Sequence, residues 1–331
     1  MRLSIYKVLF VIAWSSGFIA ADYLYPAAHT SVILFWRYLA ASLSLAIPMI
    51  VLNRRAVNWR AWCRARRTAL IRAAAVGVLA HTVWLYAVIE AQRYGVSPGA
   101  NSLINAAQPL LTAALAPLLL REPINPRVWI GLLVAFAGVT LTVYDGVSAG
   151  GALSAHLIPI ISVAAMTTSF MIEKISSTGT GRNEPSLRPA AALLVQSIAA
   201  TVAAGLIMIV VQPQPVNADA QFILAMAWVT YIPSLAAYAL LWLVLRHSSA
   251  AETSSLFYFS PVATLFMQAV VLGTPVLASE MAGSVIVASG VAFAFSTVGS
   301  RGSRSIYWRP RLRQSVFDTP RYPLTWEPRH K

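Results

Sequence analysis

The sequence is poor in charge. Only 11% of its 331 residues are charged, whereas 58% are hydrophobic. An average soluble domain carries about 25% charged residues. So few charged side chains cannot cover a soluble globular protein of this length, and the high hydrophobicity excludes a disordered chain. The composition therefore predicts an integral membrane protein.

Cysteine is almost absent. The single residue, Cys63, lies in an arginine-rich segment. A disulfide within the chain and a thiolate metal site both need at least a second cysteine. Histidines and carboxylates are not spaced for metal binding either, so the sequence predicts neither a metal nor a cofactor.

Carboxylates are missing from the middle of every long apolar run. Small proton-coupled exporters of cationic drugs use a membrane glutamate in their first span, and the first run here has none. A membrane enzyme would need clustered acids or histidines as general acid/base groups or metal ligands, and no such cluster is present. The sequence therefore disfavours cation/proton antiport and predicts that the protein is not an enzyme.

Apolar runs are what the chain has in abundance. Crossing a bilayer takes about 20 apolar residues, and none of the runs alternates with a period of two, so they predict helices rather than strands. The chain is thus expected to be an all-α integral membrane protein with ten transmembrane helices. The ten runs are Ile5–Ala21, Ser31–Leu52, Ala69–Ile89, Pro98–Leu120, Val128–Val143, Ala155–Glu173, Pro189–Val211, Gln221–Leu245, Thr253–Gly273 and Leu277–Thr297.

The first run follows a short basic segment, as in a signal peptide. No clear A-x-A cleavage site with a soluble domain follows it, so we expect a retained first span. If the N-terminus is cytoplasmic, 23 of the 25 basic residues fall on the cytoplasmic side, with Arg93 outside and Arg37 within a span. This asymmetry agrees with the positive-inside rule. It predicts cytoplasmic termini and, with the short loops, a location in a bacterial inner membrane.

The segment 298–331 carries eight basic and two acidic residues. We expect a disordered cytoplasmic tail, with binding to anionic lipid as an alternative role. The charges of the chain, +14 in all, are explained by membrane orientation, so no nucleic-acid partner is predicted.

An internal repeat divides the chain. A shift of 152 residues aligns 81–143 with 233–295 and gives 11 identical pairs in 63. Because each half holds five spans, the second half must enter the membrane in the opposite direction, which predicts two inverted five-helix repeats, 1–145 and 146–297. The most informative matches are Pro109/Pro261, Pro123/Pro275, Gly131/Gly283 and Gly138/Gly290.

Several motifs carry a family resemblance. The first half contains Trp14-Ser15-Ser16-Gly17-Phe18, Phe35-Trp36-Arg37-Tyr38-Leu39-Ala40, Leu120-Arg121-Glu122-Pro123, Trp129-Ile130-Gly131 and Gly138-Val139, and the second half repeats the last part as Pro261, Leu272-Gly273-Thr274-Pro275, Gly283 and Gly290-Val291. With these motifs the chain resembles a permease of the drug/metabolite transporter superfamily with two EamA-type domains. The resemblance implies ten helices, cytoplasmic termini and transport of small metabolites. The chain departs from the family at Thr274, where an acid is usual.

Arg37 is the costliest residue in the apolar runs. A charge within a membrane span costs about 2.5–3.5 kcal/mol even on lenient scales. It is either a binding group for a carboxylate or phosphate, or a structural arginine that reaches the interface. A shift of 159 residues places Gln196 at the equivalent position of the second half, which predicts a polar pair near the pseudo-two-fold axis.

His81 lies near the middle of the third run. It is either a proton relay, since histidine titrates near neutral pH, or a hydrogen-bonded structural residue. Other polar and aromatic residues near the run centres either line a cavity or serve helix packing and interfacial anchoring. The candidate substrate-binding residues of this kind are Trp14, Tyr86, Asn101, Asn105, Gln108, Tyr238, Tyr258 and Ser260.

Taken with the resemblance, these residues predict a secondary transporter. Uncharged polar groups together with Arg37 suit a neutral or anionic substrate better than a cation. We expect export of small polar metabolites, such as amino acids or other zwitterions or anions, by alternating access between the repeats. A proton as coupling ion and a non-transporting membrane scaffold are the alternatives left open.

Overall fold

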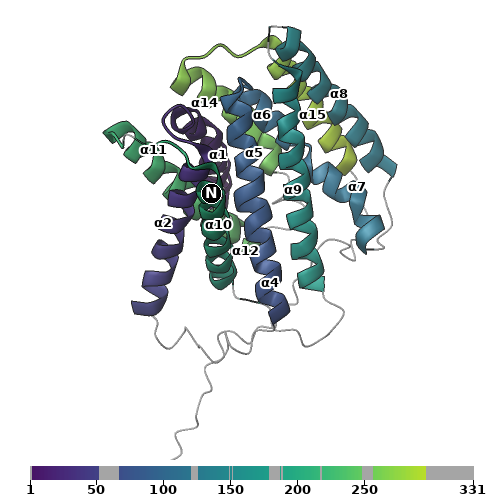
Figure 1. Ribbon diagram of the computed structural model, residues 1–331. Coiled ribbons are helices and arrows are strands. Elements are labelled where there is room, and N and C mark those ends of the chain that lie inside the picture. Colours follow the sequence, from purple (N-terminus) through teal and green to yellow (C-terminus); the bar gives the residue numbers. More distant parts are fainter. Residues whose placement is uncertain are drawn as a thin grey trace, which may run out of the picture.

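A computed structural model shows a bundle of helices of unequal length (Figure 1). It describes residues 2–51, 67–120, 126–148, 150, 152–178, 187, 189–216, 218–247 and 256–295. These described residues contain helices and connecting turns and no strand, as the sequence predicts. The basic tail 298–331 and the segment around Cys63 lie outside the described residues.

Seven helices of the described chain are long and apolar enough to cross a membrane. Two shorter apolar helical segments, Leu256–Leu272 and Ala278–Ala294, accompany them. The elements are α1 (Arg2–Leu24), α2 (Thr30–Val51), α4 (Arg67–Val76), η1 (Gly77–Val83), α5 (Trp84–Arg93), α6 (Pro98–Asn105), α7 (Gln108–Leu120), α8 (Pro126–Ser148), α9 (Leu153–Thr178), α10 (Pro189–Val211), α11 (Ala220–Tyr231), η2 (Ile232–Ala236), α12 (Ala237–His247), η3 (Leu256–Phe259), α14 (Ser260–Met267), η4 (Gln268–Leu272) and α15 (Ala278–Phe295).

The fourth apolar run forms two helices rather than one. The backbone leaves the helix after Asn105 and resumes in α7 at Gln108. Pro109 explains the break, because proline offers no N–H to the carbonyl four residues before it and its ring clashes there. On either side of the interruption, Ser102 and Asn105 of α6 and Gln108 of α7 line one of the two cavities described below.

Two equivalent helices contain a π-helical segment. The segment η1 joins α4 to α5, and η2 joins α11 to α12. The offset of 152 residues places His81 of η1 opposite Pro233 of η2. Such local widening of a helix is frequent at functional sites. Gly77, at the start of η1, touches the backbone of Gln196, so no larger residue fits there.

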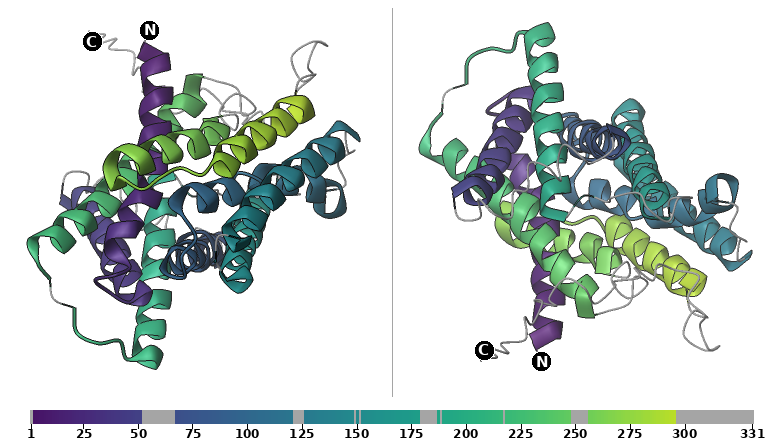
Figure 2. Two further views of the ribbon diagram at one scale, coloured as in Figure 1. Left: turned by 90° about the horizontal axis from the view of Figure 1, so that it is seen from above. Right: turned by 90° about the horizontal axis from the view of Figure 1, so that it is seen from below.

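The helices α8 and α15 pack along their lengths (Figure 2). A Cβ atom added at Gly131 would lie 2.5 Å from the carbonyl oxygen of Gly290, and one at Gly138 would lie 2.8 Å from that of Gly283. The glycines of one helix therefore let the backbone of the other approach. Gly131 corresponds to Gly283 and Gly138 to Gly290 in the repeat, so the two contacts are reciprocal and the helices run antiparallel.

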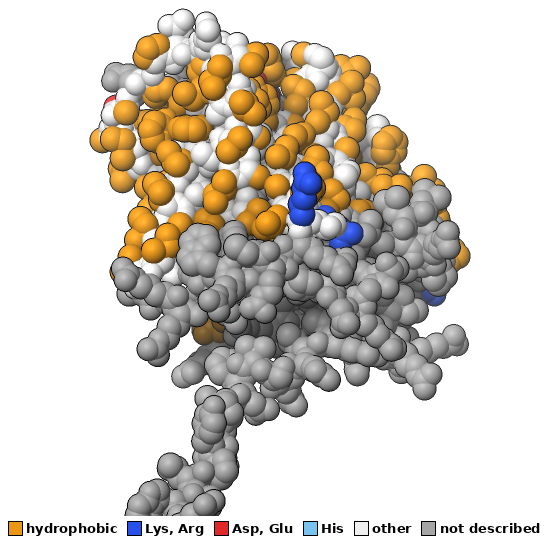
Figure 3. Space-filling view, turned by 60° about the horizontal axis from the view of Figure 1, so that its bottom comes forward, with side chains coloured by type: hydrophobic (Ala, Val, Ile, Leu, Met, Phe, Trp, Pro, Cys, Tyr) orange, Lys and Arg blue, Asp and Glu red, His pale blue; other side chains and the backbone are white. Residues whose placement is uncertain are grey.

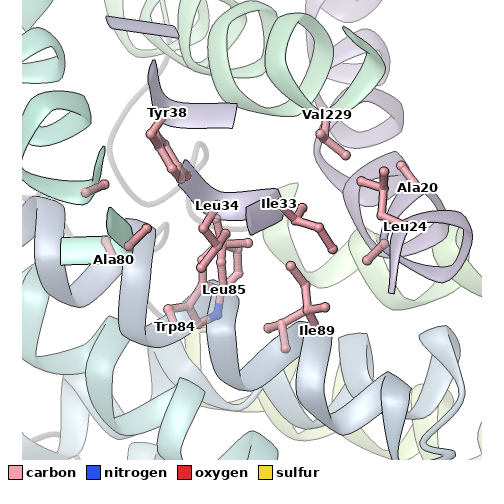
Figure 4. Packing of buried hydrophobic residues seen from close by; sticks show 14 of the residues in the cluster. Ala20, Leu24, Ile33, Leu34, Tyr38, Ala80, Trp84, Leu85, Ile89 and Val229 are labelled. Atoms are coloured by element: carbon pink, nitrogen blue, oxygen red, sulfur yellow. The ribbon is translucent and has the colours of Figure 1, made fainter. Parts of the chain in front are cut away.

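The largest apolar cluster lies around α1, α2 and α5. Figure 4 shows Leu34, Trp84 and Leu85 pointing towards one another within this cluster. The helix α1 packs inside the bundle against α11, α12 and α14. On the outer surface, hydrophobic side chains cover most of the described part in view (Figure 3). Their exposure, for example 69% at Leu133 and 83% at Val210, suits a lipid environment.

Candidate functional site

Two small cavities lie at the centre of the bundle. The first, the Arg37 cavity, is lined by polar residues of α2, η1 and α12, and the second, the Gln108 cavity, by residues of α6, α7, α9 and α14. Each has about 30 Å³ of room, which holds about one or two water molecules. The polar and aromatic members that matter below are Arg37, Tyr38, His81 and Tyr238 in the first, Ser102, Asn105, Gln108 and Ser260 in the second, and Trp14, Phe18 and Trp84 in both.

Arg37 points into the bundle. It is 5% exposed, and its Nε–H donates to Ser234 Oγ over 2.8 Å. The guanidinium carbon lies 5.5 Å from the centre of the Tyr38 ring. Among the described residues no carboxylate pairs with Arg37, and none accepts a hydrogen bond from its two Nη atoms. No described residue therefore occupies the fork of the guanidinium, and Arg37 lines the first cavity.

His81 is held on both sides of its ring. Its Nδ1 lies 3.1 Å from the hydroxyl of Tyr38, and its Nε2 lies 3.3 Å from Oε1 of Gln196. Gln196 Oε1 can only accept, so Nε2–H donates to it, and when the ring is neutral Nδ1 accepts from the Tyr38 hydroxyl. The ring of Tyr238 stands 5.7 Å away at a steep angle. His81 is 2% exposed and so belongs to a satisfied, buried network.

Two of these contacts lie at neighbouring positions of the two matching halves of the chain. Arg37 of α2 binds Ser234 of η2, and Gln196 of α10 binds His81 of η1. Arg37 corresponds to Gln196, and His81 corresponds to the residue next to Ser234. Both bonds therefore join one half of the chain to the other at nearly equivalent places. Only the bond of Arg37 involves a positively charged side chain.

The Gln108 cavity has a neutral lining. Asn105 Oδ1 accepts from Trp84 Nε1 and from Ser162 Oγ, each over 2.8 Å. The Nδ2 atom of Asn105 donates to the backbone oxygen of Asn101. Gln108 Nε2 donates to Thr112 Oγ1 over 2.9 Å, which leaves the carbonyl oxygen of Gln108 without a described donor.

The structure gathers most of the predicted residues, but not all of them. The first cavity is lined by Trp14, Arg37, His81 and Tyr238, and the second by Trp14, Asn105, Gln108 and Ser260. The other four lie outside both linings. Gln196 binds His81, and Asn101 donates to the backbone oxygen of Val88. Tyr86 packs near His29, and Tyr258 packs against the cluster between α8 and α15.

Sequence reasoning missed Tyr38 and Ser234. Ser234 follows the proline aligned with His81, so the alignment of the two halves could have pointed to it. For Tyr38 the only signal was its place directly after Arg37. It also passed over Glu280, which is 2% exposed and accepts from Ser97 Oγ and from the backbone N–H of Leu277. Within the described part of the chain, no three histidine, cysteine or acidic residues gather as metal ligands.

Comparisons with known proteins agree with this architecture. The sequence profile of the EamA-like transporter family matches residues 2–144 and 153–296. Fourteen solved chains match in structure. One of them, titled "Crystal structure of protein", has a TM-score of 0.61 over 91% of this chain and 99% of its own, at 14% identity. This likeness concerns the fold alone. No curated protein matches the sequence.

Proposed function

Since the chain belongs to the EamA-like transporter family, a family of small-molecule transporters in membranes, we propose that it exports small zwitterionic or anionic metabolites. The observation that carries this proposal is Arg37, a buried arginine that lines a cavity and has no acidic partner among the described residues. Export proceeds by alternating access across a bacterial inner membrane. Both termini of the protein lie in the cytoplasm.

The proposed architecture is ten transmembrane helices in two inverted five-helix repeats, 1–145 and 146–297. The reciprocal glycine contacts of α8 and α15 support it, because two elements related by an in-plane two-fold axis meet antiparallel and exchange equivalent contacts. The paired bonds of Arg37 and Gln196 support it in the same way.

An oxyanion suits the Arg37 cavity on electrostatic grounds. A guanidinium binds carboxylate or phosphate oxygens through two parallel N–H donors. A buried charge without a partner is costly, and a bound anion offsets that cost. A cationic substrate would meet repulsion from Arg37 and no carboxylate among the residues that line either cavity.

A coupling proton, where one is used, would bind at His81. Its ring lies in the same cavity as Arg37, so a second positive charge there is unfavourable while the cavity lacks an anion. A bound carboxylate removes this repulsion. Proton and anion would therefore bind together, which predicts that transport depends on pH and that His81→Gln abolishes the dependence.

The test is an export assay in cells that overproduce the wild type, Arg37→Ala or the lipid-facing control Trp36→Ala. Cells receive dipeptides and a panel of amino acids, organic acids and cationic dyes, and the excreted compounds are quantified at equal amounts of membrane protein. We expect efflux of a zwitterion or anion that falls at least about tenfold in Arg37→Ala and is unchanged in Trp36→Ala. Efflux that is unaffected in Arg37→Ala contradicts the role of Arg37, and absence of any efflux favours a scaffold.

A further inference from the structure

The two central cavities share one aromatic wall. Trp14, Phe18 and Trp84 line both of them. The indole rings of Trp14 and Trp84 stack with centroids 5.7 Å apart and planes inclined by 24°. Each cavity alone holds about one or two water-sized groups, so each is too small for a metabolite while the two indoles stand between them.

Both indoles are held by elements of the two repeats. Trp84 donates to Asn105 of α6, and Ser162 of α9 donates to the same oxygen. Trp14 meets Phe257 of η3 and Tyr238 of α12 edge to face, at centroid distances of 5.1 and 5.9 Å. A movement of one repeat relative to the other would therefore change the positions of both rings.

The two spaces differ in chemistry. The Arg37 cavity offers a positive charge with free N–H donors. The Gln108 cavity offers neutral groups, and the carbonyl oxygen of Gln108 accepts no hydrogen bond from a described residue. A carboxylate suits the first cavity, and a hydrogen-bond donor such as an ammonium or hydroxyl group suits the second.

We propose that one substrate molecule occupies both cavities at once. Separation of Trp14 from Trp84 joins the cavities into a single site, in which Arg37 binds a carboxylate and the Gln108 carbonyl binds a donor at the far end of the molecule. The inference rests on the proposed function and narrows its substrate class to extended carboxylates with a remote ammonium or hydroxyl group. Simple carboxylates then fill only half of the site.

The test uses two single-cysteine proteins in a Cys63→Ser background, purified in lipid nanodiscs so that reagents reach both faces. Val88→Cys reports on the Arg37 cavity and Ser102→Cys on the Gln108 cavity, because each residue lines only that one. The rate of reaction with a small methanethiosulfonate is measured in the presence of ω-amino carboxylates of two to six carbons, or of the matching unsubstituted carboxylates.

We expect at least one ω-amino carboxylate to slow labelling of both cysteines about tenfold, and its unsubstituted partner to slow Val88→Cys alone. Adding Gln108→Leu should remove the protection of Ser102→Cys and keep that of Val88→Cys. Protection of Val88→Cys alone by every probe contradicts the joined site and leaves the anion site standing. Protection of neither cysteine by any probe contradicts both the joined site and the anion site at Arg37.

The wall is tested without any ligand. Trp84→Ala removes the partition, so labelling of Ser102→Cys should rise about tenfold, whereas the lipid-facing control Trp36→Ala should leave the rate unchanged. Trp84→Phe keeps a ring but loses the N–H that binds Asn105, and an intermediate rate is expected. If Ser102→Cys is labelled equally fast in the wild-type, Trp84→Phe and Trp84→Ala backgrounds, the indoles do not separate the two cavities, whatever the substrate.

Discussion

The α8–α15 contact and the centre of the bundle both join the two repeats, but by opposite means. At α8 and α15, glycines bring the two backbones together, and a Cβ atom at Gly131 or Gly138 would collide with the facing helix. At the centre, Gly77 also meets the backbone of Gln196, but around Arg37 and His81 the repeats meet through side chains, with cavities and a few hydrogen bonds between them. Close-packed backbones resist rearrangement, whereas hydrogen bonds beside a cavity can exchange partners. We therefore expect the first contact to stay fixed and the second to move.

The largest expected effect comes from breaking the fixed contact. Gly131→Val places a branched side chain against the backbone of Gly290 and should destabilise the fold by about 3 kcal/mol or more. Leu133→Val on the same helix, at a side chain that is 69% exposed, is the control and should be near neutral. Thermal unfolding of the purified proteins measures both. A Gly131→Val protein as stable as the control would show that the helices do not pack as described.

Changing the centre should affect transport rather than stability. Arg37→Gln removes a buried charge that has no acidic partner among the described residues, so the free energy of unfolding should change by less than about 1 kcal/mol. Transport of an anionic substrate into proteoliposomes should fall at least about tenfold. Thermal unfolding and transport are measured on the same samples. Loss of transport only in step with loss of the folded protein would assign Arg37 a structural role.

A smaller loss of stability is expected at Glu280. Its carboxylate accepts hydrogen bonds from Ser97 and from the backbone of Leu277, and so ties α15 to the start of α6. Glu280→Ala leaves these partly buried donors without their acceptor and should cost about 1–3 kcal/mol. Thermal unfolding measures the cost, and a change near zero would mean that water replaces the carboxylate.

The smallest effect is expected at Tyr38. Tyr38→Phe keeps the ring beside Arg37 and removes the hydroxyl that lies 3.1 Å from His81 Nδ1. One lost buried hydrogen bond should cost about 1 kcal/mol of stability. Transport should persist, with an altered dependence on pH if His81 takes up the coupling proton. An unaltered pH profile in this variant would count against that role of His81.

The sequence allowed the membrane class, the all-helical fold and the two repeats to be predicted, because these follow from composition, run length and internal alignment. The profile match over 2–144 and 153–296 confirms the family that the motifs at Trp14–Phe18 and Glu122–Pro123 indicate. The polar residues of α6 were predicted as candidates because uncharged amides in an apolar run stand out.

The partners of these residues could not be predicted. Arg37 and Ser234 meet only after helices 197 residues apart pack together, and Trp84 meets Asn105 only through the packing of two separate helices. The break after Asn105 also escaped prediction, since Pro109 within a membrane span kinks a helix in some contexts and interrupts it in others. Local patterns indicate which residues are unusual, whereas packing decides which of them come together.

The most direct test of a fixed and a moving contact is a pair of cross-links in the Cys63→Ser background. The first link joins Asp145→Cys of α8 to Ser279→Cys of α15, since the side chains of Asp145 and Ser279 lie 2.6 Å apart. The second link joins Ser15→Cys of α1 to Ser260→Cys of α14, since the two serine hydroxyls lie 2.9 Å apart. Each pair is linked with a short reducible bifunctional reagent, and transport is measured before and after reduction. The account predicts that the first link leaves transport intact and that the second stops it until the link is reduced. Transport that is stopped by the first link, or that continues through the second, would contradict it.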